Sequence, residues 1–275
     1  MEKQKVKATL HGHLTSFNVK KPFNKIIDTA YKRLGPGGIF GQIHFGNGWY
    51  KQVAESPEGY ERIDLGNCFY VPEKDNLVCI NGQEVLARTK EGIESHLLVL
   101  AHDKNTRIKN ERTIEDSIKE AKDAEGIVGI DHPFSPYGSG HYFEKYPELI
   151  RQLDFVEVYN NLAGFWAPSF PFFPNKKAEE FYKEWKKIYP NLGSIISDDN
   201  HSLFELGRNW MMIPLLDLTN SDTVRKSLKK GLSIERKPSE EKRTGILSPY
   251  FFGSIHAGIS IYSRIIGNQQ IDFDN

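Results

Sequence analysis

The sequence has 275 residues, and its 36 Lys and Arg balance 36 Asp and Glu to a formal net charge of zero. This balance argues against a protein that binds the backbone of nucleic acid, which needs a basic surface, but it allows a small anionic substrate. The apolar runs are too short to span a membrane, and the polar N-terminus shows no signal peptide. Cys68 and Cys79 have neither zinc-binding nor redox-motif spacing. We therefore expect a globular cytoplasmic protein with free thiols.

The first half of the chain alternates β-rich runs with helical patterns. The expected elements are strand 6–14, helix 26–34, strand 39–45, turns and short strands over 46–76, strand segments 77–80 and 84–89, and strand 96–101. The run from Gly35 to Gly38 ends the helix. The turn signal Asn81-Gly82 predicts a hairpin, or a bulged approach to a strand, between its two flanking segments.

The second half continues the alternation. The expected elements are a helix from Thr113 to Gly126, strand 127–132, helix 147–153, strand 155–159, helix 176–189, strand 194–197, strand 210–216 and helix 222–230. Thr113 with Asp116 resembles a capping box, and Ser221 is expected to cap the last of these helices. The tail from 232 begins charged and contains an apolar stretch, 253–266, that suits a further helix.

This alternation of strands and helices predicts an α/β fold with a mostly parallel sheet and helices outside it. About 250 residues of such a pattern suit one closed barrel, and an open doubly wound sheet is the structural alternative. We expect residues 1–231 to form the barrel domain and residues 232–275 to be an extension packed on the same domain.

The histidines are placed at or beside the ends of predicted strands. Six of the nine share this placement: His11, His13, His44, His96, His132 and His201. His11 and His13 are two residues apart, so on a strand both side chains face the same side and can hold one metal ion. Asp199 and His201 repeat this spacing, and Glu84 is a carboxylate that can bridge two ions. Either pair alone is common in proteins, but the joint pattern favours a multinuclear site for Zn, Mn or Fe.

Ordered motifs along residues 5–231 resemble those of the PHP (polymerase and histidinol phosphatase) superfamily. They are Leu10–His13, Gly82–Glu84, His96–Leu98, Gly129–Pro133, Val156–Val158, Asp198–Ser202 with Leu206-Gly207, and the helix 221–231. The resemblance implies a distorted (β/α)7 barrel and a centre of two or three divalent transition-metal ions at the C-terminal ends of the strands. It also implies hydrolysis of phosphate esters.

Carried over residue by residue, the resemblance implies a set of metal ligands. They are His11, His13, His44, Glu84, His96, His132, Asp199 and His201, of which Asp199 and His201 would also be catalytic. The chain departs from the family pattern at four places: Thr9 replaces a common Asp, Ile43 replaces the Asp before His44, Asn18-Val19 replaces a polar ligand, and Asp198 stands where Ser is common. One of three metal positions is therefore expected to be altered, weak or empty.

Other residues have two interpretations each. Arg208 is the first candidate for a phosphate-binding cation, and the cluster Lys104, Arg107 and Lys109 is the second, but both also suit ordinary surface charges. Glu157 would orient a ligand histidine or be a buried carboxylate at a strand end. The aromatic segment 165–173 is either a hydrophobic plug or a lid over a ring-bearing substrate.

The leading hypothesis is a metal-dependent hydrolase of a small phosphomonoester or nucleotide, with no membrane partner and no prediction of oligomeric state. An exonuclease belongs to the same class, but the balanced charge argues against it. An amidohydrolase-type C–N hydrolase also begins with two histidines on a barrel strand, yet that family usually adds a bridging Lys and a lone final Asp. A non-catalytic PHP-like binding module is the third hypothesis, and metal content would discriminate it.

Overall fold

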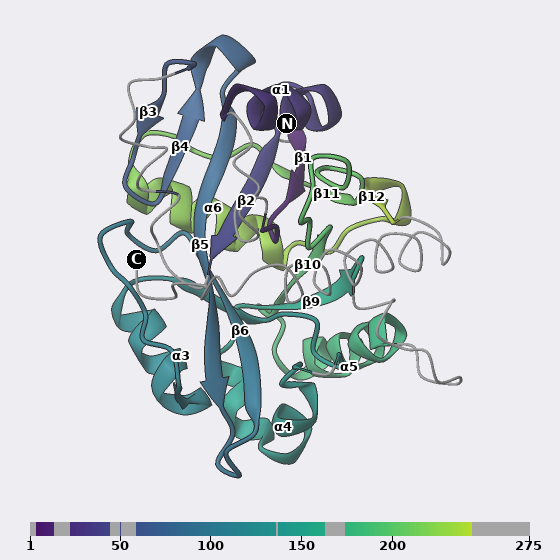
Figure 1. The fold of residues 1–275 in the computed structure, drawn as a ribbon. Coiled ribbons are helices and arrows are strands. Elements are labelled where there is room, and N and C mark those ends of the chain that lie inside the picture. The colour runs from purple at the N-terminus through teal and green to yellow at the C-terminus, as the bar shows by residue number, and fades with distance from the viewer. Residues whose placement is uncertain are drawn as a thin grey trace, which may run out of the picture.

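The computed structural model describes residues 4–13, 23–44, 50, 59–135, 137–162 and 174–243. Their strands form one mixed sheet that curls into a nearly closed barrel, with helices packed around it (Figure 1). The order of strands along the sheet is β10-β9-β8-β6-β5-β2-β1-β11-β12. The predicted α/β barrel is therefore confirmed, and the exact count of seven β/α units stays a prediction.

The element boundaries are as follows. The strands of the barrel are β1 (Lys5–Thr9), β2 (Ile39–His44), β5 (Leu77–Arg88), β6 (Glu94–Leu100), β8 (Ile127–Ile130), β9 (Phe155–Asn160) and β10 (Gly193–Ser197). The accessory strands are β3 (Ile63–Asp64), β4 (Cys68–Val71), β7 (Arg112–Thr113), β11 (Trp210–Pro214) and β12 (Glu241–Lys242). The helices are α1 (Phe23–Leu34), α3 (Ile114–Asp123), α4 (Gly140–Lys145), α5 (Pro174–Ile188) and α6 (Ser221–Ser233), with 3₁₀ turns η1 (Pro72–Lys74), η2 (Pro147–Gln152) and η3 (Pro238–Glu240).

The barrel is brought near closure where the chain after β1 meets the chain after β10. Gly12 and Asn200 form a parallel bridge there. The backbone N–H of Asp199 donates to the carbonyl of His11 (3.0 Å), and the N–H of His13 donates to the carbonyl of Asn200 (2.6 Å). This contact joins the two segments that carry the paired metal-ligand motifs.

The strand directions are mixed, whereas a mostly parallel sheet was expected. Strands β1, β2 and β5 run parallel, as do β8, β9 and β10, but β6 is antiparallel to both β5 and β8. Because β6 is reversed, its first residues lie at the barrel end where its parallel neighbours finish. His96, the third residue of β6, therefore reaches the same end as the other predicted ligands.

The hairpin predicted at Asn81-Gly82 is wrong, because β5 continues through both residues. A Cβ at residue 82 would lie 2.2 Å from Cδ1 of Ile43 and 3.0 Å from the carbonyl oxygen of Val99. The glycine thus permits close packing of neighbouring strands, and the Asn81 amide donates to the carbonyl of His102 (2.9 Å). The continuous strand carries Glu84 into the barrel.

Two helix caps and one short helix can be compared with the predictions made from local sequence. Thr113 caps α3 as predicted, since its hydroxyl accepts from the N–H of Asp116 (3.1 Å). Helix α6 is capped by Asn220, one residue before the expected Ser221, and the N–H of Thr223 donates to the Asn220 side chain. The predicted helix over 147–153 is the 3₁₀ turn η2.

Helix α6 also runs across the expected domain boundary at residue 231. Its Leu232 belongs to the main core, and β12 pairs with β11 farther along the chain. The apolar stretch 253–266 lies outside the described residues.

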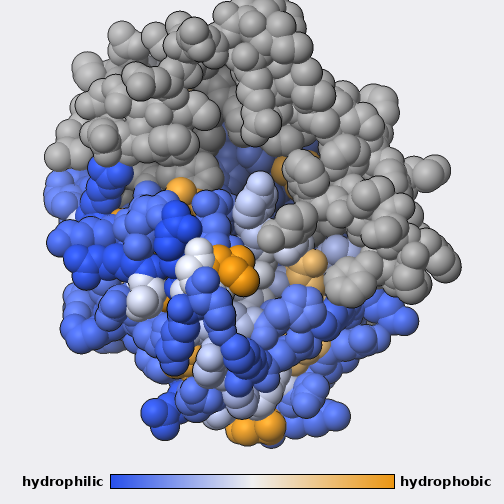
Figure 2. All heavy atoms as spheres, turned by 60° about the horizontal axis from the view of Figure 1, so that its bottom comes forward, coloured by the Kyte–Doolittle hydropathy of each residue, from blue (hydrophilic) through white to orange (hydrophobic). Residues whose placement is uncertain are grey.

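The described residues form two apolar core clusters. The larger one packs the barrel strands against α3, α5 and α6, and the smaller one lies under α1. Over the described residues, the face shown in Figure 2 is largely hydrophilic with a few separate apolar spots. None of the described helices is long and apolar enough to cross a membrane. Cys68 and Cys79 are buried free thiols, as expected.

A substitution at Gly41 tests how closely β2 approaches the chain just after β1. A Cβ at residue 41 would lie 2.0 Å from the carbonyl oxygen of Leu10, and no rotamer change can move that backbone atom. We expect Gly41→Ala to lower the free energy of unfolding by about 3 kcal/mol in urea titrations. Gly92→Ala is the control: its φ is +78° but no neighbour lies within 4 Å, so the loss should be about 1–2 kcal/mol. Equal losses would contradict the steric argument.

Candidate metal centre

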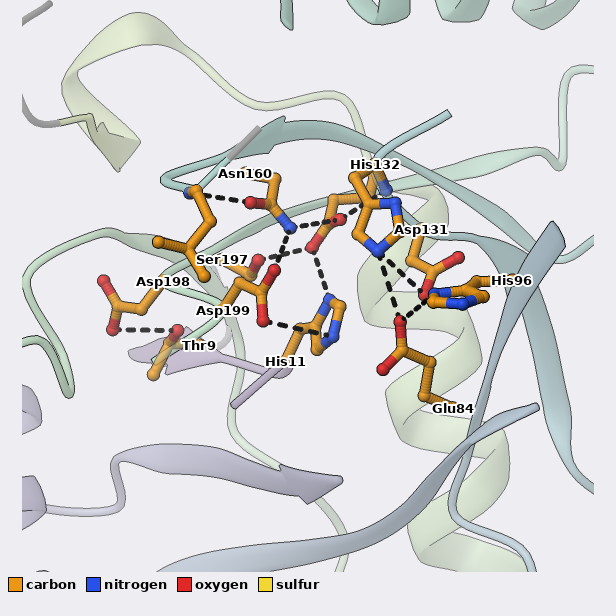
Figure 3. A network of polar contacts seen from close by, with 12 residues as sticks. Thr9, His11, Glu84, His96, Asp131, His132, Asn160, Ser197, Asp198 and Asp199 are labelled. Atoms are coloured by element: carbon orange, nitrogen blue, oxygen red, sulfur yellow. Dashed lines mark hydrogen bonds and ion pairs between the residues drawn. The ribbon is translucent and has the colours of Figure 1, made fainter. Parts of the chain in front are cut away.

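Seven of the eight predicted ligands converge at one end of the barrel, and Figure 3 labels His11, Glu84, His96, His132 and Asp199 among them. The seven are His11, His13, Glu84, His96, His132, Asp199 and His201. The eighth, His44, ends β2 with its backbone paired to Gln83, and its side chain lies outside the described part of the structure. The spacing argument therefore identified residues that the fold brings together.

The donors form three overlapping groups, each with nitrogen and oxygen atoms within 4.8 Å of one another. The groups are Glu84, His96, Asp131 and His132; His11, His13 and Glu84; and His13, Asp199 and His201. Glu84 belongs to the first two groups and His13 to the last two. The arrangement is a row of three adjoining candidate positions for cations.

Glu84 faces two groups with different oxygens. Its Oε1 lies 2.6 Å from Nδ1 of His96 and 3.2 Å from Nε2 of His132. Its Oε2 lies 3.2 Å from Nε2 of His13, and that nitrogen is 2.9 Å from Nε2 of His11. Because each carboxylate oxygen serves a different group, Glu84 has the geometry of a bridging ligand.

Backbone carbonyl and carboxylate acceptors define which ring nitrogens point into the cluster. Nδ1 of His11 lies 3.0 Å from Oε1 of Glu157, and Nδ1 of His201 lies 3.0 Å from the carbonyl oxygen of Asp199. A backbone carbonyl oxygen can only accept a hydrogen bond, and so can an ionised carboxylate oxygen. Both Nδ1 atoms therefore carry the proton. The Nε2 atoms of His11 and His201 are the ring nitrogens that face the cluster. A cation would bind there in place of a proton, since nearby carboxylates raise the pKa of His11 against the effect of burial.

Glu157 is a buried hub behind the cluster. It accepts from the backbone N–H of His132 (2.6 Å), from the Asn160 amide (2.9 Å) and from the Ser197 hydroxyl, in addition to His11. The same Asn160 amide donates to Oδ2 of Asp199 (3.1 Å). Of the two interpretations of Glu157, the structure supports orientation of a histidine. Asn160 and Ser197 were missed, because nothing in their local sequence marks them as partners of Glu157.

Asp198 is buried and does not face solvent. It accepts from the Thr9 hydroxyl (3.3 Å), from the N–H (2.7 Å) and amide (2.9 Å) of Asn209, and from the N–H of Gly207. Burial raises the pKa of Asp198 to about 7 although these hydrogen bonds lower it. Two of the departures from the family pattern, Thr9 and Asp198, are therefore in contact, and together they tie the loop after β10 to β1.

The protonation of the cluster is governed by burial and by its opposite charges. Burial lowers the pKa of His13 to about 3 despite the nearby Glu84, so this imidazole is neutral. Burial alone would raise the pKa of Asp199, but His11, His13 and His201 hold it well below its ordinary value. The pKa of Glu84 is likewise held low by His96 and His13 against the effect of burial. Against the effect of burial, nearby carboxylates raise the pKa of His11, and they raise that of His132 to about 10, so a divalent cation would displace protons from these rings when it binds.

The donor chemistry fits the ions that the resemblance implies. Imidazole nitrogens with carboxylate oxygens are typical ligands of Zn, Mn and Fe. The Asp131 carboxylate is fully buried, and neither of its oxygens has a hydrogen-bond partner in the described part of the chain. Asp131 was not among the predicted ligands, and the only sequence signal for it is its place beside His132.

Arg208 lies on the loop that follows His201. Its Nε donates to the carbonyl of Phe204 (2.7 Å), and its guanidinium stacks 3.7 Å from the centroid of the Phe204 ring. Lys104, from the second cationic cluster, pairs with Asp64 (2.6 Å). A phosphate-binding role for either group stays a prediction. The aromatic segment 165–173 lies outside the described residues.

Unfolding measurements on Glu157 and Ser197 variants test whether Glu157 stabilises the site in the absence of bound metal. Glu157→Ala leaves buried donors on His11, His132 and Asn160 without their acceptor, and we expect a loss of about 3–5 kcal/mol in the free energy of unfolding. Ser197→Ala removes one donor and should cost about 1 kcal/mol. Urea titration in the presence of a chelator removes any contribution from bound ions. Equal, small losses in the two variants would exclude the hub.

Three comparisons place the chain among known proteins. No family model and no curated protein sequence matches it. The lesion-specific endonuclease PfuEndoQ from Pyrococcus furiosus aligns with a TM-score of 0.51 and 18% identity over 82% of this chain, which spans 56% of the endonuclease. PsfC from Pseudomonas syringae aligns with a TM-score of 0.60 and 11% identity over 96% of this chain and 100% of PsfC.

The third similar structure is a two-domain protein from Bacteroides vulgatus that contains a predicted PHP-like metal-dependent phosphoesterase. It aligns with a TM-score of 0.52 and 14% identity over 91% of this chain and 70% of that protein. At these identities the similarity concerns the fold. The chain shares the fold of these three structures, one of which contains a predicted PHP-like phosphoesterase, and this agrees with the resemblance carried by its ordered motifs.

Proposed function

We propose that the protein is a hydrolase of phosphate esters that depends on two or three divalent transition-metal ions, Zn, Mn or Fe. One observation carries the proposal: three groups of imidazole and carboxylate donors adjoin one another and share Glu84 and His13. Adjacent cations suit phosphoryl chemistry because a phosphate ester presents several oxygens that carry negative charge.

Divalent ions bound in this row would supply a water of lowered pKa and neutralise the charge that develops on the phosphate. The chain's own residues position these groups. Asp199 is held through Oδ2 by Asn160, and its Oδ1 lies 3.6 Å from Nε2 of His11 and 3.4 Å from Nε2 of His13. This fixed carboxylate is the proposed group that orients the attacking water, and His201 beside it is its proposed partner.

A small phosphomonoester or nucleotide is the proposed substrate. The formal net charge of zero supports a small ligand over a long nucleic acid strand. A nuclease activity is the second candidate, and the structural similarity to the endonuclease PfuEndoQ favours it. The PHP-like fold and the bridging position of Glu84 argue against the amidohydrolase alternative, in which a Lys bridges the ions.

Metal analysis and a substrate panel test the proposal. Carefully purified protein should contain more than one transition-metal ion per chain, and it should release phosphate from small esters when Mn, Zn and Fe are supplied separately. The panel should include phosphomonoesters, short oligonucleotides with and without base lesions, and amide substrates. Protein that contains no metal and is not activated by added ions would contradict the proposal. Bound metal without turnover would favour a binding module.

Asp199→Asn tests the proposed catalytic carboxylate. The amide preserves the shape of the side chain but removes its charge, so kcat should fall by about three orders of magnitude or more while the circular dichroism spectrum is unchanged. Asp123→Asn, on the exposed face of α3, removes a carboxylate of the same kind and serves as the control. Normal turnover in Asp199→Asn would remove this residue from the mechanism.

Arg208→Ala separates phosphate binding from local packing. A phosphate ligand contributes charge-assisted hydrogen bonds, so its loss should raise KM for a phosphomonoester about tenfold or more with little change in metal content. If Arg208 only packs on Phe204, the melting temperature will fall while KM stays the same.

A further inference from the structure

The buried carboxylates at this end of the barrel differ in what surrounds their oxygens. Asp198 and Glu157 each accept several hydrogen bonds, most of them from backbone N–H groups or side-chain amides. Such carboxylates are satisfied without any bound ligand. They support the loops and leave no acceptor open.

Asp131 is the contrasting case. Its side chain is 0% exposed, and both carboxylate oxygens lack a hydrogen-bond partner among the described residues. Its Oδ2 lies 3.5 Å from Nε2 of His132, within the distance of an ion pair. A buried carboxylate without donors is strongly disfavoured, whether it is ionised or protonated, unless another partner compensates it.

The backbone explains why two adjacent residues reach the same cluster. Successive side chains of a strand point to opposite faces, so Asp131 and His132 could not share a site on a regular strand. Strand β8 ends at Ile130, and His132 has a φ of +24°, which breaks the alternation. Figure 3 shows both side chains beside Glu84 and His96 as a result. This conformation is unfavourable for a residue with a side chain and needs compensation from its surroundings.

We propose that Asp131 is a metal ligand and completes the position formed by Glu84, His96 and His132. This inference rests on the proposed metal-dependent function and assigns a ligand that the motif resemblance does not include. The donor set becomes two imidazoles and two carboxylates, whose two negative charges balance one divalent cation.

The cation position formed by Glu84, His96, Asp131 and His132 has two carboxylates, whereas each of the other two groups has one. Glu84 turns its Oε1 toward this group and its Oε2 toward His13, so it is shared with the neighbouring group. Asp131 belongs to the one group alone. The ion held by Asp131 is therefore the most firmly bound of the row, and it withstands dilution or chelation when the others are lost.

Metal titration of matched variants tests the assignment. Wild-type protein, Asp131→Asn and Asp154→Asn are dialysed against Zn or Mn buffered over a range of free concentrations, and the bound ions per chain are counted by mass spectrometry. Asp154 is the control because it is also buried beside β8, where it accepts from the N–H of Val128 and pairs with Lys229 (2.6 Å). Asp154 lies just before β9, at the end of these strands opposite to the candidate metal centre.

We expect Asp131→Asn to lose the most firmly held ion, with an affinity at least about 100-fold weaker, since removing even an outer partner of a ligand costs 10–100-fold. Asp154→Asn should keep the wild-type metal content. Unchanged binding in Asp131→Asn, or equal losses in both variants, would overturn the assignment of Asp131 and leave the proposed function standing. A wild-type protein that binds no metal would overturn the proposed function itself.

A second measurement does not depend on the folding of a variant. Anomalous scattering from wild-type crystals grown with Zn locates each ion directly. An ion about 2.0–2.2 Å from an oxygen of Asp131 supports the assignment. Ions that all lie outside bonding distance of that carboxylate would overturn it.

Discussion

The contact on which the site depends is the one that brings the barrel near closure, between the segment after β1 and the segment after β10. Gly12 favours it, because a Cβ there would lie 2.2 Å from the Asn200 amide nitrogen and would displace that buried side chain. Two backbone hydrogen bonds and the Gly12–Asn200 bridge hold the segments together. The pair His11 and His13 meets the pair Asp199 and His201 only because of this contact.

Buried carboxylates have two different roles around this contact. Asp198 and Glu157 are surrounded by hydrogen-bond donors, so they hold the loops and the histidine rings in place. Glu84 and Asp199 face imidazole nitrogens instead, and their charges remain available to a cation. The framework and the donors are thus distinguishable by their partners, although all four residues are buried acids.

Local signals were reliable where one element decides the outcome. The Thr113 cap depends on a single turn of helix, and it forms as predicted. Asn81-Gly82 has the composition of a hairpin turn, but strands β2 and β6 pack on both sides of it and keep it extended. Gly82 permits a close tertiary contact with Ile43, whereas its local sequence is typical of a turn.

The sequence by itself determined the alternating α/β pattern, the paired spacing of His11 with His13 and of Asp199 with His201, and the order of motifs that resembles the PHP superfamily. These features follow from periodicities of two residues on a strand and from spacing along the chain, which are local properties. Only the tertiary structure decided the reversal of β6 that delivers His96, and the bend after β8 that places Asp131 beside His132. Strand direction and bends depend on packing between distant segments, so no local pattern specifies them.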